Sequence, residues 1–400
     1  MIIPSSRTAQ FHYAIRNIVS AAEALERKGR RVTYLNIGDP QVFGFRPPQH
    51  IVEPVQRALR DKFTGYSHST GLPEAREAIA EYASRLESPT TRDDVIVTSG
   101  ASEAADLVLT ALLNPGDEVL LPAPGYPIYP AILSKLGAVP RYYTLDERQG
   151  WQPSVSEMAS LISERTRTII LINPNNPAGS VTPDQTTLQI LELAYENNLL
   201  VISDEVYREL CFGESPTAAS VLAQQLDMPL ITLESLSKTH LIPGWRVGWM
   251  RFSKPNKMRE LIVAITRLAS GRLCSPTPTQ YAVKPALTGD KAFMLRFLED
   301  IRARRDFAVA RVDSIDGLSS STPEAAFYLM VKAVDPEGRS DEQLVLEMLE
   351  STAVLVVHGS GFGCDPLDGY FRLVYLADEE TLGHAFAEIQ RFLSDQRVKT

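Results

Sequence analysis

Residues 168–179 read Thr-Ile-Ile-Leu-Ile-Asn-Pro-Asn-Asn-Pro-Ala-Gly, and this stretch decides the fold. The apolar run 168–172 has the length of a buried strand. Two prolines and three asparagines follow at once, and they build a stiff loop because they neither continue a strand nor begin a helix. Ligands of open α/β sheets bind at the carboxyl ends of strands. We therefore predict that residues 173–179 form a functional loop rather than a plain turn.

Further strands, alternating with helices, are predicted on both sides of this stretch. Apolar runs of strand length recur at 95–98, 118–121, 199–203, 230–233 and 247–250. Helical periodicity fills the intervals, as in 103–113, 184–197 and 257–268. Short apolar strands separated by helices predict an α/β fold with a mainly parallel sheet that is covered on both faces. We assign this large domain to residues 46–290.

The pattern changes after residue 290. A long charged helix is predicted over 291–312, and weaker strands follow at 325–331, 353–357 and 370–374. We interpret residues 291–400 as a second, smaller α/β domain. At the other end, a helix over 14–28 is followed by a stretch rich in proline and glycine at 36–48. Residues 1–45 are expected to be an N-terminal arm that packs with the small domain.

The composition is that of an ordinary folded protein. The chain has 400 residues, of which 44% are hydrophobic and 22% charged, with a formal net charge of -9. A length prior of roughly 150 residues per domain gives two or three domains. An acidic balance argues against a nucleic-acid partner, which calls for a basic face. No run approaches the roughly 18 apolar residues that span a membrane.

The three cysteines, Cys211, Cys274 and Cys364, lie far apart in the sequence. They form no CxxC pair, so the sequence indicates neither a disulfide framework nor a metal site. The N-terminal stretch lacks the long apolar segment of a secretory signal. A reducing cytoplasm is the simplest location for such a chain.

The segment Val95-Ile-Val-Thr-Ser-Gly-Ala-Ser-Glu-Ala104 predicts a strand, a glycine turn and a helix whose N-cap is Ser102. Free N–H groups at the start of a helix suit a phosphate. An ordinary capped turn explains the same pattern. The segment matches neither the P-loop nor the GxGxxG fingerprint, which argues against ATP and NAD sites.

Acidic residues end the apolar strand in Leu199-Leu-Val-Ile-Ser-Asp-Glu-Val-Tyr207. A carboxylate at the end of a buried strand needs a partner, because removing an unpaired charge from water is costly. A protonated ring nitrogen would supply that partner. The alternative is an acidic side chain that reaches solvent at the edge of the sheet.

Lys238 lies in Glu234-Ser-Leu-Ser-Lys-Thr-His-Leu-Ile-Pro-Gly-Trp-Arg-Val-Gly248, after two serines and eight residues before Arg246. A lysine that forms a Schiff base must be partly neutral at working pH, and burial and nearby cations lower its pKa toward that range. Ser235 and Ser237 offer hydroxyl groups to a phosphate, and Arg246 offers a bidentate fork. A lone loop lysine is usually only solvated, so the neighbours of Lys238 carry this prediction.

Taken together, the four segments resemble the class I and II aminotransferases, which are pyridoxal 5'-phosphate (PLP) enzymes of fold type I with a seven-stranded sheet. The resemblance runs over nearly the whole chain. Within this family, the chain most resembles the bacterial glutamate–pyruvate (alanine) aminotransferases. That likeness rests on Tyr34-Leu-Asn-Ile-Gly-Asp-Pro40, Phe43-Gly-Phe45, Asn173-Pro-Asn-Asn-Pro177, Ser235-Leu-Ser-Lys238 and Arg272-Leu-Cys274.

The resemblance implies how PLP is held. Lys238 would carry it as a Schiff base and then act as general acid and base, and Asp204 would pair with its ring nitrogen. The remaining contacts would be Ala101, Ser102, Ser235, Ser237 and Arg246 at the phosphate, Asn176 and Tyr207 at the ring oxygen, and Tyr126 on the ring face. Tyr66 matches a tyrosine that reaches the phosphate of a neighbouring subunit, which implies a homodimer with shared active sites.

The resemblance also implies a substrate site. Arg372 and Gly38 match contacts to the substrate α-carboxylate, with Asn176 nearby. Arg16 resembles an arginine that binds the distal carboxylate of glutamate, with Tyr13 close to it, and a plain helix-face arginine is the alternative. The segment Tyr13-Ala-Ile-Arg-Asn17 departs from the family pattern around this arginine. The donor preference therefore stays open.

We expect transamination between L-alanine and 2-oxoglutarate. An aminotransferase with an aspartate, aromatic or branched-chain donor is an alternative, and so is a PLP-dependent lyase that eliminates a β- or γ-substituent, such as a C–S lyase. These share Lys238, Asp204 and Arg246, so the motifs discriminate poorly among them. A transcription regulator on this fold needs an appended DNA-binding domain, for which the chain has no room.

Overall fold

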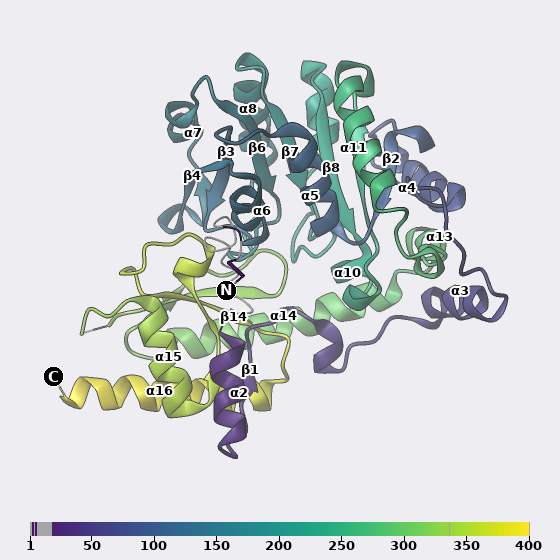
Figure 1. Cartoon of the computed structure of the whole chain (residues 1–400). Coiled ribbons are helices and arrows are strands. Elements are labelled where there is room, and N and C mark those ends of the chain that lie inside the picture. Colours follow the sequence, from purple (N-terminus) through teal and green to yellow (C-terminus); the bar gives the residue numbers. More distant parts are fainter. Residues whose placement is uncertain (1, 4, 6–17, 336, 400) are drawn as a thin grey trace.

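The structure is a computed structural model that describes residues 2, 3, 5, 18–335 and 337–399 (Figure 1). Its larger sheet has eight strands in the order β2-β9-β8-β7-β6-β3-β4-β5. These strands are β2 (Val95–Thr98), β3 (Glu118–Ala123), β4 (Val139–Asp146), β5 (Gln152–Pro153), β6 (Thr166–Ile172), β7 (Leu200–Asp204), β8 (Leu230–Ser235) and β9 (Gly248–Ser253). Strands β4, β3, β6, β7 and β8 run parallel, whereas β9 is antiparallel to both its neighbours. The predicted mainly parallel sheet is confirmed, and the two-residue β5 is an eighth strand at its edge.

Both faces of this sheet are covered by helices, as the continuous apolar runs predict. Along β6, Ile170 and Ile172 belong to one core and Ile169 and Leu171 to another. The first core includes residues of α5 (Ala101–Leu112), α6 (Ile128–Leu136) and α11 (Arg259–Gly271). The second includes residues of α7 (Val155–Leu161), α8 (Asp184–Glu196) and α9 (Ala219–Leu222). Successive strand residues point to opposite faces, so a strand buried on both sides must be apolar at every position.

A smaller antiparallel sheet has the order β10-β11-β14-β13. Its strands are β10 (Leu318–Ser320), β11 (Tyr328–Ala333), β13 (Val357–His358) and β14 (Tyr370–Val374), and its helices are α14 (Ala292–Asp313), α15 (Asp341–Thr352) and α16 (Glu379–Lys399). The single strand predicted at 353–357 is wrong. Residues Val354–Leu355 form β12, which pairs with β1 (Thr33–Tyr34), and only the next residues join β14. The predicted strand is split into two because its first part pairs with β1 and its last part pairs with β14.

Residues 18–35 pack with this smaller sheet and its helices. Helix α2 (Val19–Arg27) buries Ala22 and Leu25 in the same core as Leu344 and Phe386. Residues 14–17 of the predicted helix lie outside the described residues. Among the helices that the structure describes, none is both long enough and apolar enough to cross a membrane.

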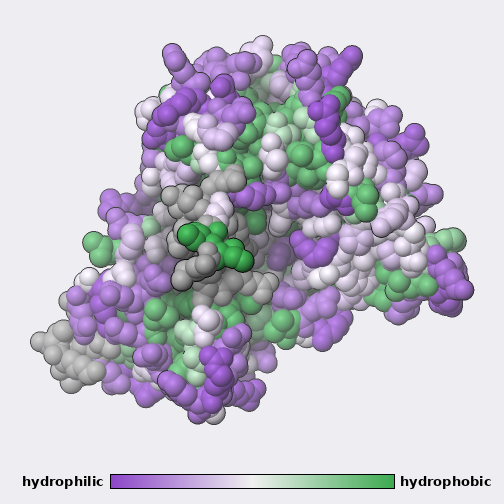
Figure 2. All heavy atoms as spheres, in the orientation of Figure 1, coloured by the Kyte–Doolittle hydropathy of each residue, from purple (hydrophilic) through white to green (hydrophobic). Residues whose placement is uncertain are grey.

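The remaining helices lie at the far end of the larger sheet from α15 and α16 (Figure 1). They are α3 (Gln49–Arg60), α4 (Pro73–Arg85), α12 (Thr277–Gln280) and α13 (Val283–Thr288), while the short α10 (Leu236–Thr239) follows β8 directly. Figure 2 shows hydrophilic residues over much of the outer rim of the molecule and a hollow near its middle. The candidate site is lined by residues of both the larger and the smaller sheet.

Candidate active site

One cavity of about 530 Å³ brings together the predicted site residues that the structure describes, except Tyr66. It lies at the carboxyl ends of β6, β7 and β8, beside the start of α5 and against β14 of the smaller sheet. The predicted residues that line it are Gly38, Ala101, Ser102, Tyr126, Asn176, Asp204, Tyr207, Ser235, Ser237, Lys238, Arg246 and Arg372. The exposed fraction of Tyr66 is 83%, and it does not line this cavity. Tyr13 and Arg16 lie outside the described residues.

Lys238 lies on α10 with its Nζ 2.6 Å from the carbonyl oxygen of Gly38, to which it donates. Burial lowers the pKa of Lys238 to about 8, and the positive charges of Arg372 and Arg246 act in the same direction, while Asp39 opposes them. A lysine with such a pKa is partly neutral near pH 7–8, which a nucleophilic amine requires. Its environment is therefore suited to a Schiff base.

An anion site forms where α5 begins next to Arg246. The N-cap of α5 is Gly100, whose φ of 84° is a left-handed value that favours glycine. A Cβ on Gly100 would lie 2.4 Å from Nη2 of Arg246, so only glycine lets the guanidinium come this close. Ser235 Oγ accepts a hydrogen bond from the N–H of Ser237 at 3.0 Å. A helix start, an arginine and two serine hydroxyls are the donors that a phosphate group needs.

The predicted N-cap, Ser102, is wrong. The helix begins at Ala101, because the left-handed turn at Gly100 starts it earlier than the serine pattern indicates. Gly248 on the neighbouring β9 permits this, since a Cβ there would lie 2.6 Å from the N atom of Ala101. Ser102 therefore lies in the first turn of α5 and lines the cavity.

Asp204, rather than Glu205, is the carboxylate that faces the cavity. Its Oδ2 accepts a hydrogen bond of 2.7 Å from the hydroxyl of Tyr129 on α6. Burial raises the pKa of Asp204 to about 6, and the bonds from Tyr129 and the N–H of Val206 partly oppose this rise. Glu205 points elsewhere, where its Oε2 lies 3.3 Å from Nε of Arg208. Among the residues that the structure describes, no cationic side chain forms an ion pair with Asp204, and such a buried carboxylate fits a protonated ring nitrogen.

The loop after β6 is stiffened by its own side chains. Asn173 donates to the carbonyl of Thr182 and accepts from its N–H, both at 3.0 Å. Asn175 Oδ1 accepts from the N–H of Ala178 at 3.0 Å. With these two asparagines engaged inside the loop, Asn176 is the one that lines the cavity.

Arg372 on β14 is almost completely buried, with an exposed fraction of 1%. It donates to Asn176 Oδ1 at 3.0 Å and to the carbonyl of Asn36 at 2.6 Å. Its guanidinium carbon lies 4.5 Å from the ring centre of Tyr328 and 4.6 Å from that of Phe362. A guanidinium fixed between two rings, with its edge toward a cavity, suits the bidentate binding of a carboxylate.

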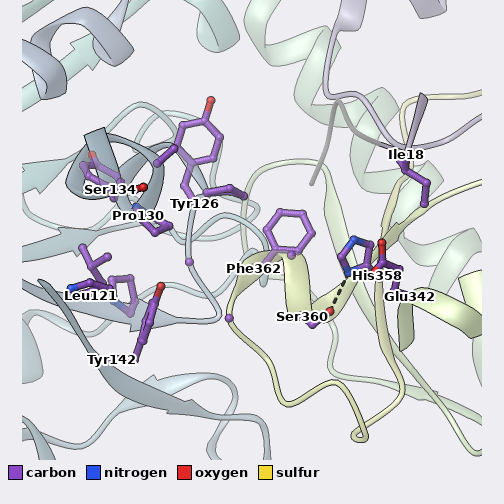
Figure 3. Close-up of a pocket in the computed structure, with 18 of the residues that line it drawn as sticks. Ile18, Leu121, Tyr126, Pro130, Ser134, Tyr142, Glu342, His358, Ser360 and Phe362 are labelled. Carbon is purple, nitrogen blue, oxygen red and sulfur yellow. Dashed lines mark hydrogen bonds between the residues drawn. The ribbon is translucent and has the colours of Figure 1, made fainter. Parts of the chain in front are cut away.

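A second cleft of about 820 Å³ adjoins the cavity and shares Tyr126 with it. Figure 3 shows Tyr126 on one side of this cleft and Phe362 on the other, with His358 and Ser360 beyond Phe362. The N–H of Gly125 donates to the carbonyl of Phe362 at 2.8 Å, so the two sheets are joined at this point. Tyr126 thus lies at the boundary between the two spaces, and Phe362 lines the second cleft.

Three residues of this arrangement were missed by sequence reasoning: Tyr129, Tyr328 and Phe362. Tyr129 follows Tyr126 by three residues and lies in the first turn of α6, so its nearness in sequence to a predicted ring contact was a usable pattern. Tyr328 and Phe362 reach the site only through the pairing of β11 and β13 with β14. No local pattern indicates such a contact.

The comparisons with known proteins agree with this geometry. The model of the family described as aminotransferase class I and II matches residues 30–389. A glutamate-pyruvate aminotransferase of Haemophilus influenzae is 36% identical over 397 residues, which cover 96% of each chain. The solved structure of an alanine aminotransferase from Pyrococcus furiosus has a TM-score of 0.95 at 39% identity, covering 98% of this chain and 100% of that one. An aspartate aminotransferase from Rhizobium meliloti has a TM-score of 0.90 at 28% identity, covering 98% and 99%.

Proposed function

This chain belongs to the class I and II aminotransferases, and we propose that it uses PLP to transfer the amino group between L-alanine and 2-oxoglutarate, giving pyruvate and L-glutamate. The observation that carries the proposal is the cavity in which Lys238, Asp204 and Arg372 meet the anion site at Arg246. Alanine as donor is supported by the activities for which the relatives of Haemophilus influenzae and Pyrococcus furiosus are named.

The residues of the cavity fit the parts of PLP. The phosphate would bind at the start of α5 with Ser235, Ser237 and Arg246, where the glycine at position 100 leaves room for the Arg246 guanidinium. Asp204 would face the ring nitrogen, and Asn176 and Tyr207 the ring oxygen. Asn176 gives its Oδ1 to Arg372, so its amide nitrogen can donate to that ring oxygen. Tyr126 would cover the ring face.

Each remaining function falls to a residue of this chain. When bound, PLP supplies an electron sink for the electron pair left at the substrate α-carbon. Arg372 binds the substrate α-carboxylate as a fork and so fixes the orientation of the α-carbon. Lys238, held between the two sheets, takes the α-proton on its neutral amine and later returns a proton. The hydrogen bond from the N–H of Gly125 to the carbonyl of Phe362 joins the segments that follow β3 and β13 beside this site.

A matrix of amino donors against pyruvate and 2-oxoglutarate tests this function. We expect alanine with 2-oxoglutarate, and glutamate with pyruvate, to give the highest kcat/KM. A higher value with aspartate, an aromatic or a branched-chain donor would replace the alanine assignment. Release of ammonia from an amino acid without any oxo acid would indicate a lyase and contradict transamination.

Tyr129→Phe is expected to shift the pH dependence of PLP binding. The pKa of Asp204 is raised to about 6, so its carboxylate is present above that pH and is lost as the pH falls through it. Affinity for a protonated ring nitrogen therefore weakens below about pH 6. Removing the hydroxyl of Tyr129 removes a bond that lowers this pKa, so the weakening should begin roughly one unit higher.

The measurement is a PLP titration of the apoenzyme from pH 5 to 8. Tyr143→Phe is the matched control, because Tyr143 is equally buried and its hydroxyl donates to the carbonyl of Ile170 rather than to a carboxylate. Ionisation of the phosphate is common to all variants and cancels in the comparison. Identical profiles for Tyr129→Phe and wild type would show that Asp204 does not pair with the cofactor.

We also propose that the enzyme is a homodimer with shared active sites. Tyr66 is exposed and does not line the cavity of its own subunit, and the side chains of Leu59, Phe63 and Leu273 are each more than half exposed. Large apolar and aromatic side chains that are exposed on one subunit are typical of a subunit interface. Tyr66 would then reach the phosphate site of the partner.

Mixing two inactive variants tests this arrangement. A hybrid of a Lys238→Ala subunit with a Tyr66→Ala subunit has one site with both residues intact. We expect the reassociated mixture to be clearly more active than the sum of its parts, up to about one quarter of wild type from random pairing. Activity that is simply additive would mean that Tyr66 does not serve the neighbouring site.

Two further assignments complete the proposal. The limits 1–45, 46–290 and 291–400 are proposed for the arm, the PLP-binding domain and the small domain, since the core changes from the larger to the smaller sheet near residue 290. A cytoplasmic location is supported by the three cysteines, which are all free thiols.

A further inference from the structure

Tyr328, the first residue of β11, contacts several parts of the cavity at once. Its hydroxyl oxygen lies 2.7 Å from that of Tyr207, and both side chains are buried. Its ring centre lies 4.5 Å from the guanidinium carbon of Arg372. A Cβ on Gly38 would lie 2.3 Å from the Tyr328 hydroxyl oxygen, so the absence of a side chain at Gly38 makes room for this hydroxyl. Tyr328 therefore touches the proposed cofactor contact and the proposed substrate contact.

The hydrogen bond between the two tyrosines has a definite direction if Tyr207 serves the cofactor. A phenol has one proton to donate. Burial raises the pKa of Tyr207 well above its ordinary value, so this proton stays in place at working pH. If Tyr207 donates it to the ring oxygen of the cofactor, the hydrogen between the tyrosines comes from Tyr328. A hydroxyl that accepts a hydrogen bond also donates more strongly.

The ring of Tyr328 has a separate effect. With Phe362 on the other face at 4.6 Å, it fixes the plane of the Arg372 guanidinium. A bidentate bond to a carboxylate depends on that plane. The hydroxyl and the ring can therefore be removed independently, and each removal should affect a different step.

We propose that Tyr328 is a positioning residue with two separable functions: its hydroxyl orients Tyr207 toward the ring oxygen of the cofactor, and its ring orients Arg372 toward the substrate carboxylate. This inference rests on the proposed function. The other titratable and charged residues that line the cavity are Asp39, Tyr126, Tyr129, Asp204, Tyr207, Lys238, Arg246 and Arg372. Substitution of Tyr328 changes the chemical identity of none of them.

The test is a spectroscopic pH titration of the holoenzyme, combined with steady-state kinetics, in three variants. Tyr328→Phe keeps the ring and removes the hydroxyl. Because a weaker bond from Tyr207 stabilises the deprotonated cofactor–lysine linkage less, the pKa of the visible band should rise by roughly 0.3–0.7 units. The KM for alanine should stay within about twofold.

Phe362→Leu is the matched control on the other face of Arg372. It should raise the KM for alanine and for 2-oxoglutarate by roughly 3- to 30-fold, as expected for the loss of a buried cation–π contact, and leave the spectroscopic pKa unchanged. Tyr328→Leu should combine both effects. This split between spectrum and KM would not arise from general loosening of the fold.

Two outcomes would overturn the inference. One is a Tyr328→Phe enzyme whose spectroscopic pKa equals that of wild type, and the other is a Phe362→Leu enzyme whose pKa shifts as much as that of Tyr328→Phe. Failure of the proposed function is distinguishable: without PLP binding, wild type would show no titratable visible band, whereas release of ammonia without an oxo acid would contradict transamination and leave the pKa comparison between variants valid.

Discussion

Lys238→Ala is expected to lower turnover by about 10⁴-fold or more and to abolish the visible absorption of the bound cofactor. The reason is that the same nitrogen has two functions. It would form the covalent bond to PLP, and its amine would move the substrate α-proton. Burial that lowers the pKa of Lys238 to about 8 makes it suitable for both.

The control for this variant is Lys254→Ala. Lys254 lies in a surface ion pair, 2.7 Å from Asp227, and does not line the cavity. Its removal should leave turnover and spectrum within about twofold of wild type, because exposed ion pairs contribute little. Retention of the visible band in Lys238→Ala would mean that another lysine holds the cofactor.

Arg372→Ala should lower kcat/KM for both the amino acid and the oxo acid by roughly 10²- to 10³-fold, mainly through KM. Its guanidinium is buried, bonded to Asn176 and Asn36, and held between Tyr328 and Phe362. Truncation leaves the substrate carboxylate in the same buried place without its fork. The measurement is steady-state kinetics with each substrate varied.

Arg372→Lys separates charge from geometry. It keeps a positive charge but cannot form two parallel hydrogen bonds, so we expect a KM between those of wild type and Arg372→Ala. The visible band of bound PLP should persist in both variants, which shows that the cofactor site is intact. An unchanged KM in Arg372→Ala would place the carboxylate contact elsewhere.

Local sequence predicts the strands of the larger sheet well, because a strand buried on both faces is apolar at every position. The residues of β6 illustrate this, since the successive residues Ile169 and Ile170 belong to different cores. The antiparallel direction of β9 could not be predicted in this way, because an apolar run has no direction. The division of 353–357 into β12 and β13 depends on partners more than 300 residues and about 15 residues away, which no local pattern records.

For the site, the strand-end pattern alone predicted a buried carboxylate but did not separate Asp204 from Glu205. The family resemblance selected Asp204, and in the structure Asp204 lines the cavity. The N-cap of α5 is Gly100 and not Ser102, because the turn at Gly100 has a positive φ and the helix begins directly after it. The role of Tyr328 could not be predicted, because Tyr207 and Arg372 are far from it in the sequence and come into contact with it only through the fold.

The most direct test of the central claim is to reduce the PLP-loaded enzyme with borohydride and map its peptides by mass spectrometry. Reduction makes a lysine–cofactor bond permanent. We predict one modified residue, Lys238, and no modification in Lys238→Ala. Modification at a different lysine, or none in an enzyme that transaminates, would contradict the assignment of Lys238 as the residue that holds the cofactor.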